Sequence, residues 1–208
     1  DWVLLSADYS QVELRLMAAM SGDKQMLDAF AKGADIHAQT ASAVYNVPLE
    51  EVTPQQRARC KMVNFGILYG ISAFGLAERL RIPRREAQQL IEAVLGHFPS
   101  VKQYMQELIE TARVKGYAET RFGRRRALPD ITSRNGAVRA AAERIALNMP
   151  IQGTAADIIK FAMVRIQKEL DQRGLRTQMI LQIHDELLFD VPKCELDIVK
   201  PLIQEIME

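Results

Sequence analysis

The sequence predicts an α+β chain that is mostly helical and carries a small antiparallel sheet. Along most of its 208 residues, apolar positions recur at helical spacing between caps and prolines. Three short runs are instead expected to be strands: residues 3–7 form an apolar run, and residues 178–183 and 187–191 are rich in β-forming residues. Because only three polar residues separate the last two runs, we expect them to form a hairpin.

Local signals place the first strand and the first helices. Residues 3–7 form a short apolar run, which predicts a buried strand. Ser10, followed by Glu13 three positions later, has the pattern of a capping box and predicts a helix over residues 11–20. A further helix is expected over residues 35–45, ended by the asparagine and proline that follow.

The middle of the chain is predicted to be helical. Thr53 has the features of a helix cap, with a proline in the first turn and Gln56 at the third position. We expect that helix to extend to about residue 70. Pro83 and Pro99 mark two further helices, because proline is tolerated in a first turn but interrupts a helix interior.

The last third of the chain returns to mixed structure. Residues 116–120 predict a short strand, and residues 122–126 an arginine-rich loop. Two helices are expected over residues 135–148 and 151–173, separated at a proline. A final helix is expected to begin near Glu195.

Composition excludes several classes of protein. With 48% hydrophobic and 25% charged residues, the chain is too apolar for a disordered tail. Its longest apolar run is only a few residues, so we expect no membrane-spanning helix. The two cysteines, Cys60 and Cys194, are far apart and suggest no disulfide framework, which favours a reducing compartment. Because the chain opens without Met, we expect it to be part of a larger protein.

The net charge of +1 hides two basic blocks. Residues 53–85 and 113–144 each carry a net charge of +6, whereas residues 1–52 carry −5. This layout is expected where one surface contacts phosphates and another contacts metal or solvent. Ordinary solvated helix faces give the same pattern, so the charge alone leaves both interpretations open.

Two carboxylates are candidates for metal binding. Asp8 follows the first predicted strand, and Asp185 lies in the predicted hairpin turn. Acids held at the ends of rigid strands are suitable oxygen ligands for Mg²⁺, and a cation between them would relieve their repulsion. Alternatively, Asp8 caps a helix and Asp185 is a turn residue, roles in which Asp is common.

One helical stripe carries the most specific pattern. Arg57, Lys61, Phe65 and Tyr69 follow one another at intervals of four residues, which places them along one helix face. Two cations suit a triphosphate, and two rings suit a base or sugar. An amphipathic core helix would explain the rings but gains nothing from the cations.

These motifs and their order resemble family A DNA polymerases of the bacterial DNA polymerase I type. Residues 8–15 (DYSQVELR) resemble the family's motif A, residues 57–70 (RARCKMVNFGILYG) motif B, and residues 182–186 (QIHDE) motif C. Residues 119–130 and 140–160 also resemble family segments. The resemblance covers essentially the whole chain.

The resemblance implies a catalytic centre that uses two Mg²⁺ ions. Asp8 and Asp185 would be metal ligands, with the backbone carbonyl of Tyr9 as a further ligand and Glu186 as an accessory acid. The ions would activate the primer 3′-hydroxyl and stabilise the pyrophosphate leaving group. Lys61 would be the proton donor to pyrophosphate.

The resemblance also implies a set of nucleotide-binding residues: Gln11, Glu13, His37, Arg57, Lys61, Phe65 and Tyr69. Glu13 would be the steric gate against a ribose 2′-hydroxyl, which competes with its role in a capping box. We favour the gate. His37 would contact the triphosphate, although without the resemblance it would be interpreted as an ordinary surface histidine.

DNA contacts are implied for a second set of residues. Arg144, Asn148 and Gln152 lie four residues apart and resemble the family's contacts in the minor groove. His184 would touch the primer terminus. The basic residues 124–126 are a weaker candidate for phosphate contacts.

The implied architecture is a right-hand polymerase fold without a thumb. The palm would comprise residues 1–33 and 133–208, and the fingers with their return segment residues 34–132. With much phosphate-contacting surface missing, we expect weak, salt-dependent DNA affinity.

The expected activity is template-directed DNA synthesis from deoxynucleoside triphosphates on primer-template DNA, in replication and repair. We expect a monomer in the bacterial cytoplasm, associated with the nucleoid and not with a membrane. One alternative is a nucleic-acid-binding module without activity. A metal-dependent nuclease is disfavoured because it has no need of a triphosphate-binding stripe.

Overall fold

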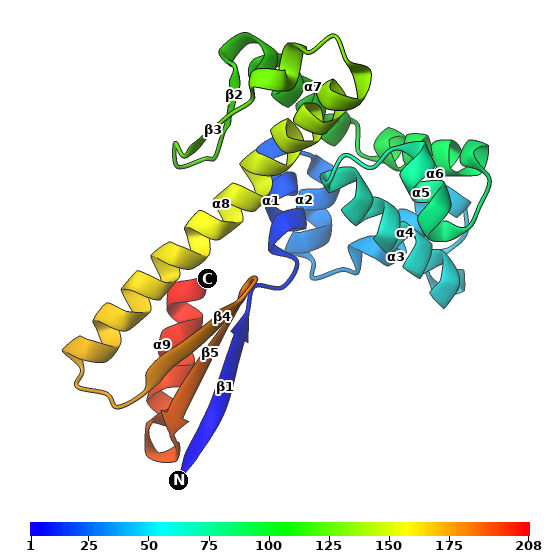
Figure 1. The fold of residues 1–208 in the computed structure, drawn as a ribbon. Coiled ribbons are helices and arrows are strands. Elements are labelled where there is room, and N and C mark those ends of the chain that lie inside the picture. The colour runs from blue at the N-terminus through cyan, green and yellow to red at the C-terminus, as the bar shows by residue number, and fades with distance from the viewer. The chain divides into compact units, whose positions relative to one another are not determined.

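The computed structural model describes residues 1–208, which divide into two compact units. The first unit comprises residues 1–12 and 154–208, and the second comprises residues 13–153. Each unit is described by itself below. The chain is mostly helical with small antiparallel sheets, which confirms the predicted fold class (Figure 1).

The first unit is built on a three-stranded antiparallel sheet in the order β1-β5-β4. Its elements are β1 (Trp2–Asp8), β4 (Gln178–Ile183), β5 (Glu186–Pro192), the short 3-10 helix η3 (Lys193–Glu195) and α9 (Leu196–Met207). Helix α9 lies along the sheet (Figure 1). The predicted strands and their hairpin are therefore confirmed.

One face of this sheet is buried and the other is open. Leu187, Phe189 and Val191 of β5 are fully buried and pack with residues of α9 and of the end of helix α8 (Gly136–Gln172). Because successive side chains of a strand point to opposite faces, the alternate residues Ser6 and Asp8 of β1 lie on the exposed face. The candidate acidic residue of β1 therefore lies on the open face.

The second unit is an assembly of helices with one short hairpin. Its helices are α1 (Val12–Ser21), which begins at the unit boundary, α2 (Lys24–Ala31), α3 (Ile36–Tyr45), α4 (Pro54–Leu68), α5 (Ala73–Leu80), α6 (Arg84–His97) and α7 (Pro99–Lys115). Two 3-10 helices, η1 (Leu49–Glu51) and η2 (Pro129–Thr132), join them. The strands β2 (Tyr117–Glu119) and β3 (Arg125–Ala127) form the hairpin.

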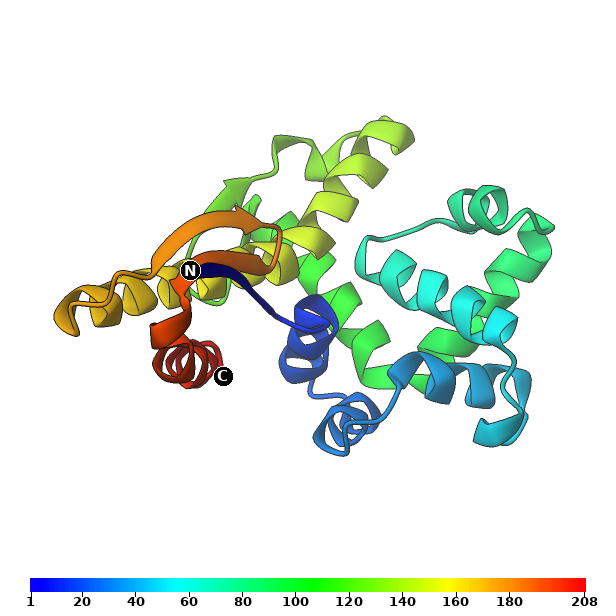
Figure 2. The same cartoon turned by 90° about the horizontal axis from the view of Figure 1, so that it is seen from below.

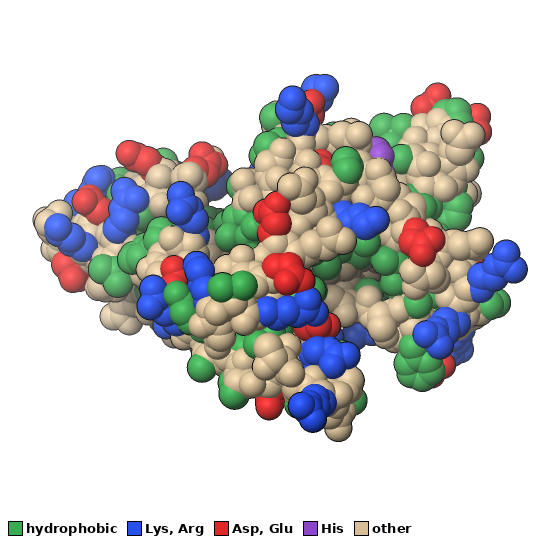
Figure 3. Space-filling view, turned by 90° about the horizontal axis from the view of Figure 1, so that it is seen from above, with side chains coloured by type: hydrophobic (Ala, Val, Ile, Leu, Met, Phe, Trp, Pro, Cys, Tyr) green, Lys and Arg blue, Asp and Glu red, His purple; other side chains and the backbone are tan.

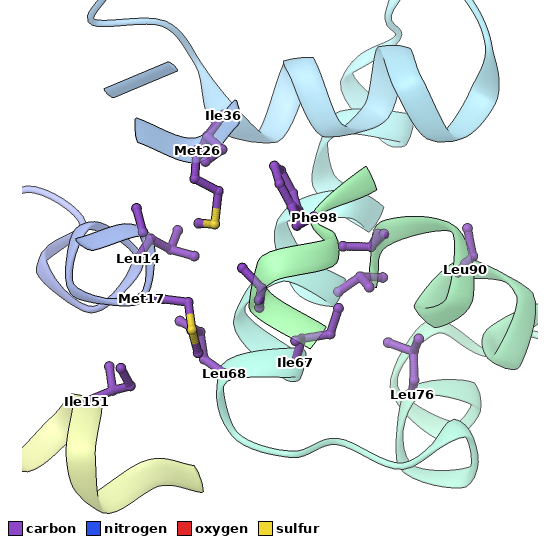
Figure 4. Packing of buried hydrophobic residues seen from close by; sticks show 14 of the residues in the cluster. Leu14, Met17, Met26, Ile36, Ile67, Leu68, Leu76, Leu90, Phe98 and Ile151 are labelled. Carbon is purple, nitrogen blue, oxygen red and sulfur yellow. The ribbon is translucent and has the colours of Figure 1, made fainter. Parts of the chain in front are cut away.

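A large apolar core joins helices α1 to α7 of the second unit. Figure 4 shows Leu14 and Met17 of α1 facing Met26 of α2 and Leu68 of α4. Phe98, between α6 and α7, closes the same cluster. Helices α3 and α4 pack side by side (Figure 2). This packing fixes the helices that carry the predicted nucleotide-binding residues.

Helices α3 and α4 each begin at a capping residue, and of these the cap of α4 was predicted. Asp35 accepts hydrogen bonds from the backbone amides of His37 and Ala38 and so begins α3, which ends at Asn46 in the left-handed conformation. Thr53 and Gln56 form the expected reciprocal capping box at the start of α4.

The prediction of two helices around Pro150 is wrong. Helix α8 (Gly136–Gln172) continues through this proline. Proline removes one backbone donor and strains the preceding turn, at a cost of about 3 kcal/mol. Buried contacts on both sides offset this cost, because Ala146 and Ile151 each belong to an apolar cluster.

The predicted helix over residues 11–20 begins one residue later than expected. Gln11 has a φ of +56°, and the first helical residue of α1 is Val12. The capping box of Ser10 and Glu13 stays a prediction. Two eight-residue helices, α2 and α5, were not predicted. Part of the predicted loop at residues 122–126 is strand, because β3 begins at Arg125.

None of the helices combines the length and the apolar character that crossing a membrane requires. On the face drawn in Figure 3, Lys and Arg side chains are interspersed with Asp and Glu. Several arginines of the two basic blocks form ion pairs with carboxylates: Arg57, Arg59, Arg113 and Arg125. The predicted phosphate-binding surface stays a prediction.

Candidate active site

The first unit brings three acidic residues to one end of its sheet. Asp8 is the last residue of β1 and lies opposite Glu186, the first residue of β5. Asp185 precedes Glu186 in the tight turn between β4 and β5. The backbone amide of Tyr9 donates to the carbonyl of Asp185 at 3.2 Å, which ties the end of β1 to this turn.

The turn itself has an unusual backbone. His184 has a φ of +55°, a backbone conformation that residues other than glycine rarely adopt. Gln182 stabilises it by donating from Nε2 to the His184 carbonyl at 3.0 Å. Strained positions of this kind cluster at functional sites. The side chain of His184 is exposed beside the acidic residues.

Electrostatic repulsion marks the acidic cluster. Burial raises the pKa of Asp8, and the negative charges of Asp185 and Glu186 raise it further. Ser6 donates from Oγ to Oε1 of Glu186 at 2.5 Å. Sequence reasoning missed Ser6, although its position two residues before Asp8 places both on one face of β1.

The donor set of this cluster fits Mg²⁺. Nowhere in the chain do three or more His, Cys, Asp or Glu side chains converge on a metal position. Mg²⁺ is commonly held by only one or two carboxylates, with water and substrate phosphates completing its coordination. Asp8 and Asp185 would supply hard carboxylate oxygens, and a cation between them would relieve the repulsion that helps to raise the pKa of Asp8.

The predicted stripe on α4 becomes more buried along its length. Arg57 and Lys61 are exposed, and Phe65 and Tyr69 are half-buried. Arg57 donates from Nε to Oδ2 of Asp35 at 2.5 Å. The Arg57 guanidinium lowers the pKa of the Asp35 carboxyl against the opposing effect of burial. The cation pair thus lies at the solvent-facing end of the stripe.

His37 is buried, so its interpretation as a surface histidine is wrong. Only 3% of the residue is exposed, and burial lowers its pKa to about 4. Its ring lies 5.6 Å from that of Phe65, and its Nδ1 is 3.1 Å from Nδ2 of Asn64. The structure therefore brings His37 together with the α4 stripe, as the resemblance implies.

Glu13 and Tyr69 form a direct contact. The Tyr69 hydroxyl donates to Oε2 of Glu13 at 2.5 Å. The Glu13 carboxylate thus faces α4. The contact places the proposed gate and the last ring of the stripe side by side within the second unit.

The candidate DNA contacts lie along α8. Arg144 and Gln152 are exposed, and Asn148 between them is half-buried. Oδ1 of Asn148 is buried without a hydrogen-bond partner. Within the first unit, Gln11 is exposed and follows Tyr9 and Ser10 after the acidic end of β1. None of the contacts described for these side chains indicates which ligand they would bind.

Three residues around the α4 stripe escaped sequence reasoning: Asp35 as the partner of Arg57, Asn64 as the partner of His37, and Thr40 as the partner of Asn64. Asp35 was expected only as the start of a helix. Asn64 precedes Phe65 in the helix pattern, and no local signal marks it, because its partner His37 lies 27 residues away.

Comparison with known proteins places the chain in a family. A model of DNA polymerase family A matches residues 1–208. The chain is 49% identical over 208 residues to DNA polymerase I of Geobacillus stearothermophilus, and 51% identical over 209 residues to DNA polymerase I of Streptococcus pneumoniae. Each match covers 100% of this chain and 24% of the relative.

A solved structure agrees with this match. The POL domain of Pol1 from M. smegmatis, in complex with DNA primer-template and dNTP, superimposes with a TM-score of 0.94 at 46% identity. The match covers 98% of this chain and 36% of that one. The chain thus spans about a quarter of the length of the curated relatives named above. With an acidic cluster, a stripe of cations and rings, and this match along its whole length, the chain belongs to DNA polymerase family A.

Proposed function

We propose that the chain carries the catalytic centre for template-directed DNA synthesis. The observation that supports this most directly is the cluster of Asp8, Asp185 and Glu186 at one end of the sheet, in a member of DNA polymerase family A. In this reaction the primer 3′-oxygen bonds to the α-phosphorus of a deoxynucleoside triphosphate, and the bond to pyrophosphate breaks. Roles in replication and repair belong to the same proposal.

Asp8, Asp185 and the carbonyl of Tyr9 would hold two Mg²⁺ ions, with Glu186 beside them. When bound, Mg²⁺ lowers the pKa of the primer hydroxyl and stabilises charge on the leaving pyrophosphate. The hydrogen bond from Ser6 holds Glu186 in place on the open face of the sheet. The tie between Tyr9 and Asp185 keeps the two candidate ligand segments together.

The α4 stripe would bind the incoming nucleotide. Arg57 and Lys61 bind the triphosphate, and Lys61 donates a proton to pyrophosphate as it leaves. His37 contacts the same phosphates, and Phe65 packs against the sugar and base. Gln11 and Glu13 contact the sugar side, where Glu13 excludes a ribose 2′-hydroxyl, and Tyr69 occupies the position that the template base takes.

Arg144, Asn148 and Gln152 would contact primer-template DNA in the minor groove, and His184 the primer terminus. Residues 1–33 and 133–208 would act as palm and residues 34–132 as fingers. The monomeric state and the location in the bacterial cytoplasm, at the nucleoid, are part of this proposal.

Primer extension tests the proposal. The protein is incubated with primer-template DNA, the four deoxynucleoside triphosphates and Mg²⁺, and compared with Asp8→Ala. Asp190→Ala is a matched control, because Asp190 lies in β5 four residues after Glu186. Extension by the parent and by Asp190→Ala, with loss in Asp8→Ala, supports the proposal. DNA binding without extension by a folded parent overturns it in favour of a binding module without activity.

A further inference from the structure

A chain of buried hydrogen bonds links α3 to α4. The Thr40 hydroxyl donates to the Ile36 carbonyl at 2.6 Å, and Nδ2 of Asn64 donates to Thr40 Oγ1 at 3.1 Å. The same Nδ2 lies 3.1 Å from Nδ1 of His37. All three side chains are buried, with exposed fractions of 0% for Thr40, 6% for Asn64 and 3% for His37.

The direction of these bonds is fixed by the number of hydrogens. A hydroxyl has one hydrogen, and that of Thr40 is used by the Ile36 carbonyl. Thr40 Oγ1 therefore accepts, and Asn64 must present its NH₂ group rather than its oxygen. The reverse orientation of the amide would also leave two buried donors unpaired, whereas the observed one leaves only Oδ1 unpaired.

The tautomer of His37 follows from this orientation. The NH₂ group of Asn64 has two hydrogens, one for Thr40 and one for His37. Nδ1 of His37 must then accept, so it carries no proton. In a neutral imidazole the single proton consequently lies on Nε2.

The surroundings keep the His37 ring neutral at physiological pH. Burial lowers its pKa most, the nearby charges of Arg57 and Lys61 lower it further, and only Asp35 opposes them. A protonated ring would add a third positive charge beside these two cations. A neutral ring avoids this repulsion and retains one directional donor.

We propose that Asn64 and Thr40 are positioning residues that hold His37 as the Nε2–H tautomer, so that it donates a neutral hydrogen bond to a phosphate oxygen of the nucleotide. The inference rests on the proposed function of Arg57, Lys61 and His37 in binding the triphosphate. Neither Asn64 nor Thr40 touches the nucleotide, and both act through the ring.

Nitrogen-15 NMR of histidine-labelled protein tests the tautomer without any substrate. The chain has three histidines, so His37→Gln assigns the His37 signals. The parent should show a pyridine-type Nδ1 and a pyrrole-type Nε2. In Asn64→Asp, the carboxylate accepts from the ring and Nδ1 becomes protonated. Protonated Nδ1 in the parent, or an even mixture of tautomers, would overturn the proposal.

Substitution of Thr40 tests the proposal while His37 and Asn64 stay unchanged. Thr40→Val removes the hydroxyl that orients the Asn64 amide, so the amide turns and the two tautomers mix. Thr40→Ser retains the hydroxyl and the parent spectrum. Ser42→Ala is a matched control, because it removes a similar hydroxyl-to-carbonyl bond from α3, that of Ser42 to Val47. A single Nε2–H tautomer in Thr40→Val would contradict the proposed role of Thr40.

Steady-state primer extension then tests the link to the nucleotide. Asn64→Asp should raise the KM for the deoxynucleoside triphosphate about 10-fold with a smaller change in kcat, and Thr40→Val should raise it above that of Thr40→Ser. An unchanged KM despite an altered tautomer would overturn the positioning role. Absence of extension in the parent would refute the proposed function instead, and the NMR result would still decide the tautomer.

Discussion

The acidic cluster and the α4 stripe differ in how their charges are compensated. At the end of β1 and β5, Asp8 is repelled by Asp185 and Glu186, and the Ser6 hydroxyl is a neutral partner for Glu186. On the stripe and beside it, three functional groups already have an internal partner: Arg57 with Asp35, His37 with Asn64, and Tyr69 with Glu13.

This difference indicates two modes of ligand binding. The acidic cluster would be stabilised by positive charge from outside, because the negative charges of Asp185 and Glu186 add to the effect of burial in raising the pKa of Asp8. The stripe is preorganised, so a nucleotide that binds there as proposed would displace or extend existing contacts. Loss of an acid should therefore abolish the reaction, whereas loss of a stripe partner should change nucleotide affinity.

The largest effect is expected for the acidic cluster. Asp185→Ala should reduce the rate of primer extension by about 10³-fold or more, since a ligand of the proposed metal is lost. The fold should be retained, because Asp185 lies in a turn. Primer extension and circular dichroism of the same preparation check both statements. Extension at the parent rate would remove Asp185 from the catalytic centre.

A smaller effect is expected on the stripe. Arg57→Ala should raise the KM for the nucleotide about 10- to 100-fold, because a charge-assisted contact to phosphate is lost. Arg59→Ala is the matched control: it is on the same helix but pairs with Glu86 at 3.4 Å. Equal KM values for the two variants would contradict the assignment of Arg57.

A fall in pH should stabilise the first unit and destabilise the second. The pKa of Asp8 is raised on folding, so the first unit is destabilised at neutral pH and gains stability as pH falls through the raised pKa. The pKa of His37 is lowered to about 4, so the unfolded chain takes up a proton first. Stability of the second unit is therefore lost as pH falls from about 6.5 toward 4.

The loss of stability associated with His37 should be about 3 kcal/mol at pH 4, and it should vanish in His37→Phe. The loss is measured by urea unfolding at pH 7, 5.5 and 4, with hydrogen exchange used to detect the unfolding of each unit separately. The Asp8→Asn variant should remove the opposite trend from the first unit. The same pH dependence in the parent and in His37→Phe would show that the ring is not buried and neutral.

The smallest effect is expected for Asp35→Ser. Serine still caps α3 but is too short to reach Arg57, so the guanidinium is released for the nucleotide. The KM should fall about 2- to 3-fold, since an exposed ion pair contributes little. Asp23→Ser, which changes the cap of α2, is the control. A raised KM for Asp35→Ser would show that Asp35 positions Arg57 rather than competing for it.

Features with local causes could be predicted from the sequence. The strands around Asp185 and the capping box of Thr53 depend on residues within a few positions of each other, and both are present. The α4 stripe was found for the same reason, because its spacing is that of one helix face.

Features with distant causes could not be predicted. The helix through Pro150 depends on packing by Ala146 and Ile151, which a proline rule does not include. The side-chain direction of Glu13 depends on Tyr69, 56 residues later in the chain. The burial of His37 likewise depends on the packing of α3 against α4.

Backbone hydrogen exchange during a Mg²⁺ titration without nucleotide tests the contrast between the two regions most directly. Mg²⁺ should slow exchange at Tyr9 and at residues 184–187 and should leave the exchange rates of residues 57–69 unchanged. In the Asp8→Asn variant, Mg²⁺ should not change the exchange rates of any of these residues. Equal slowing in Asp8→Asn, or no slowing in the parent, would contradict the claim that the acidic cluster is the region that requires a cation.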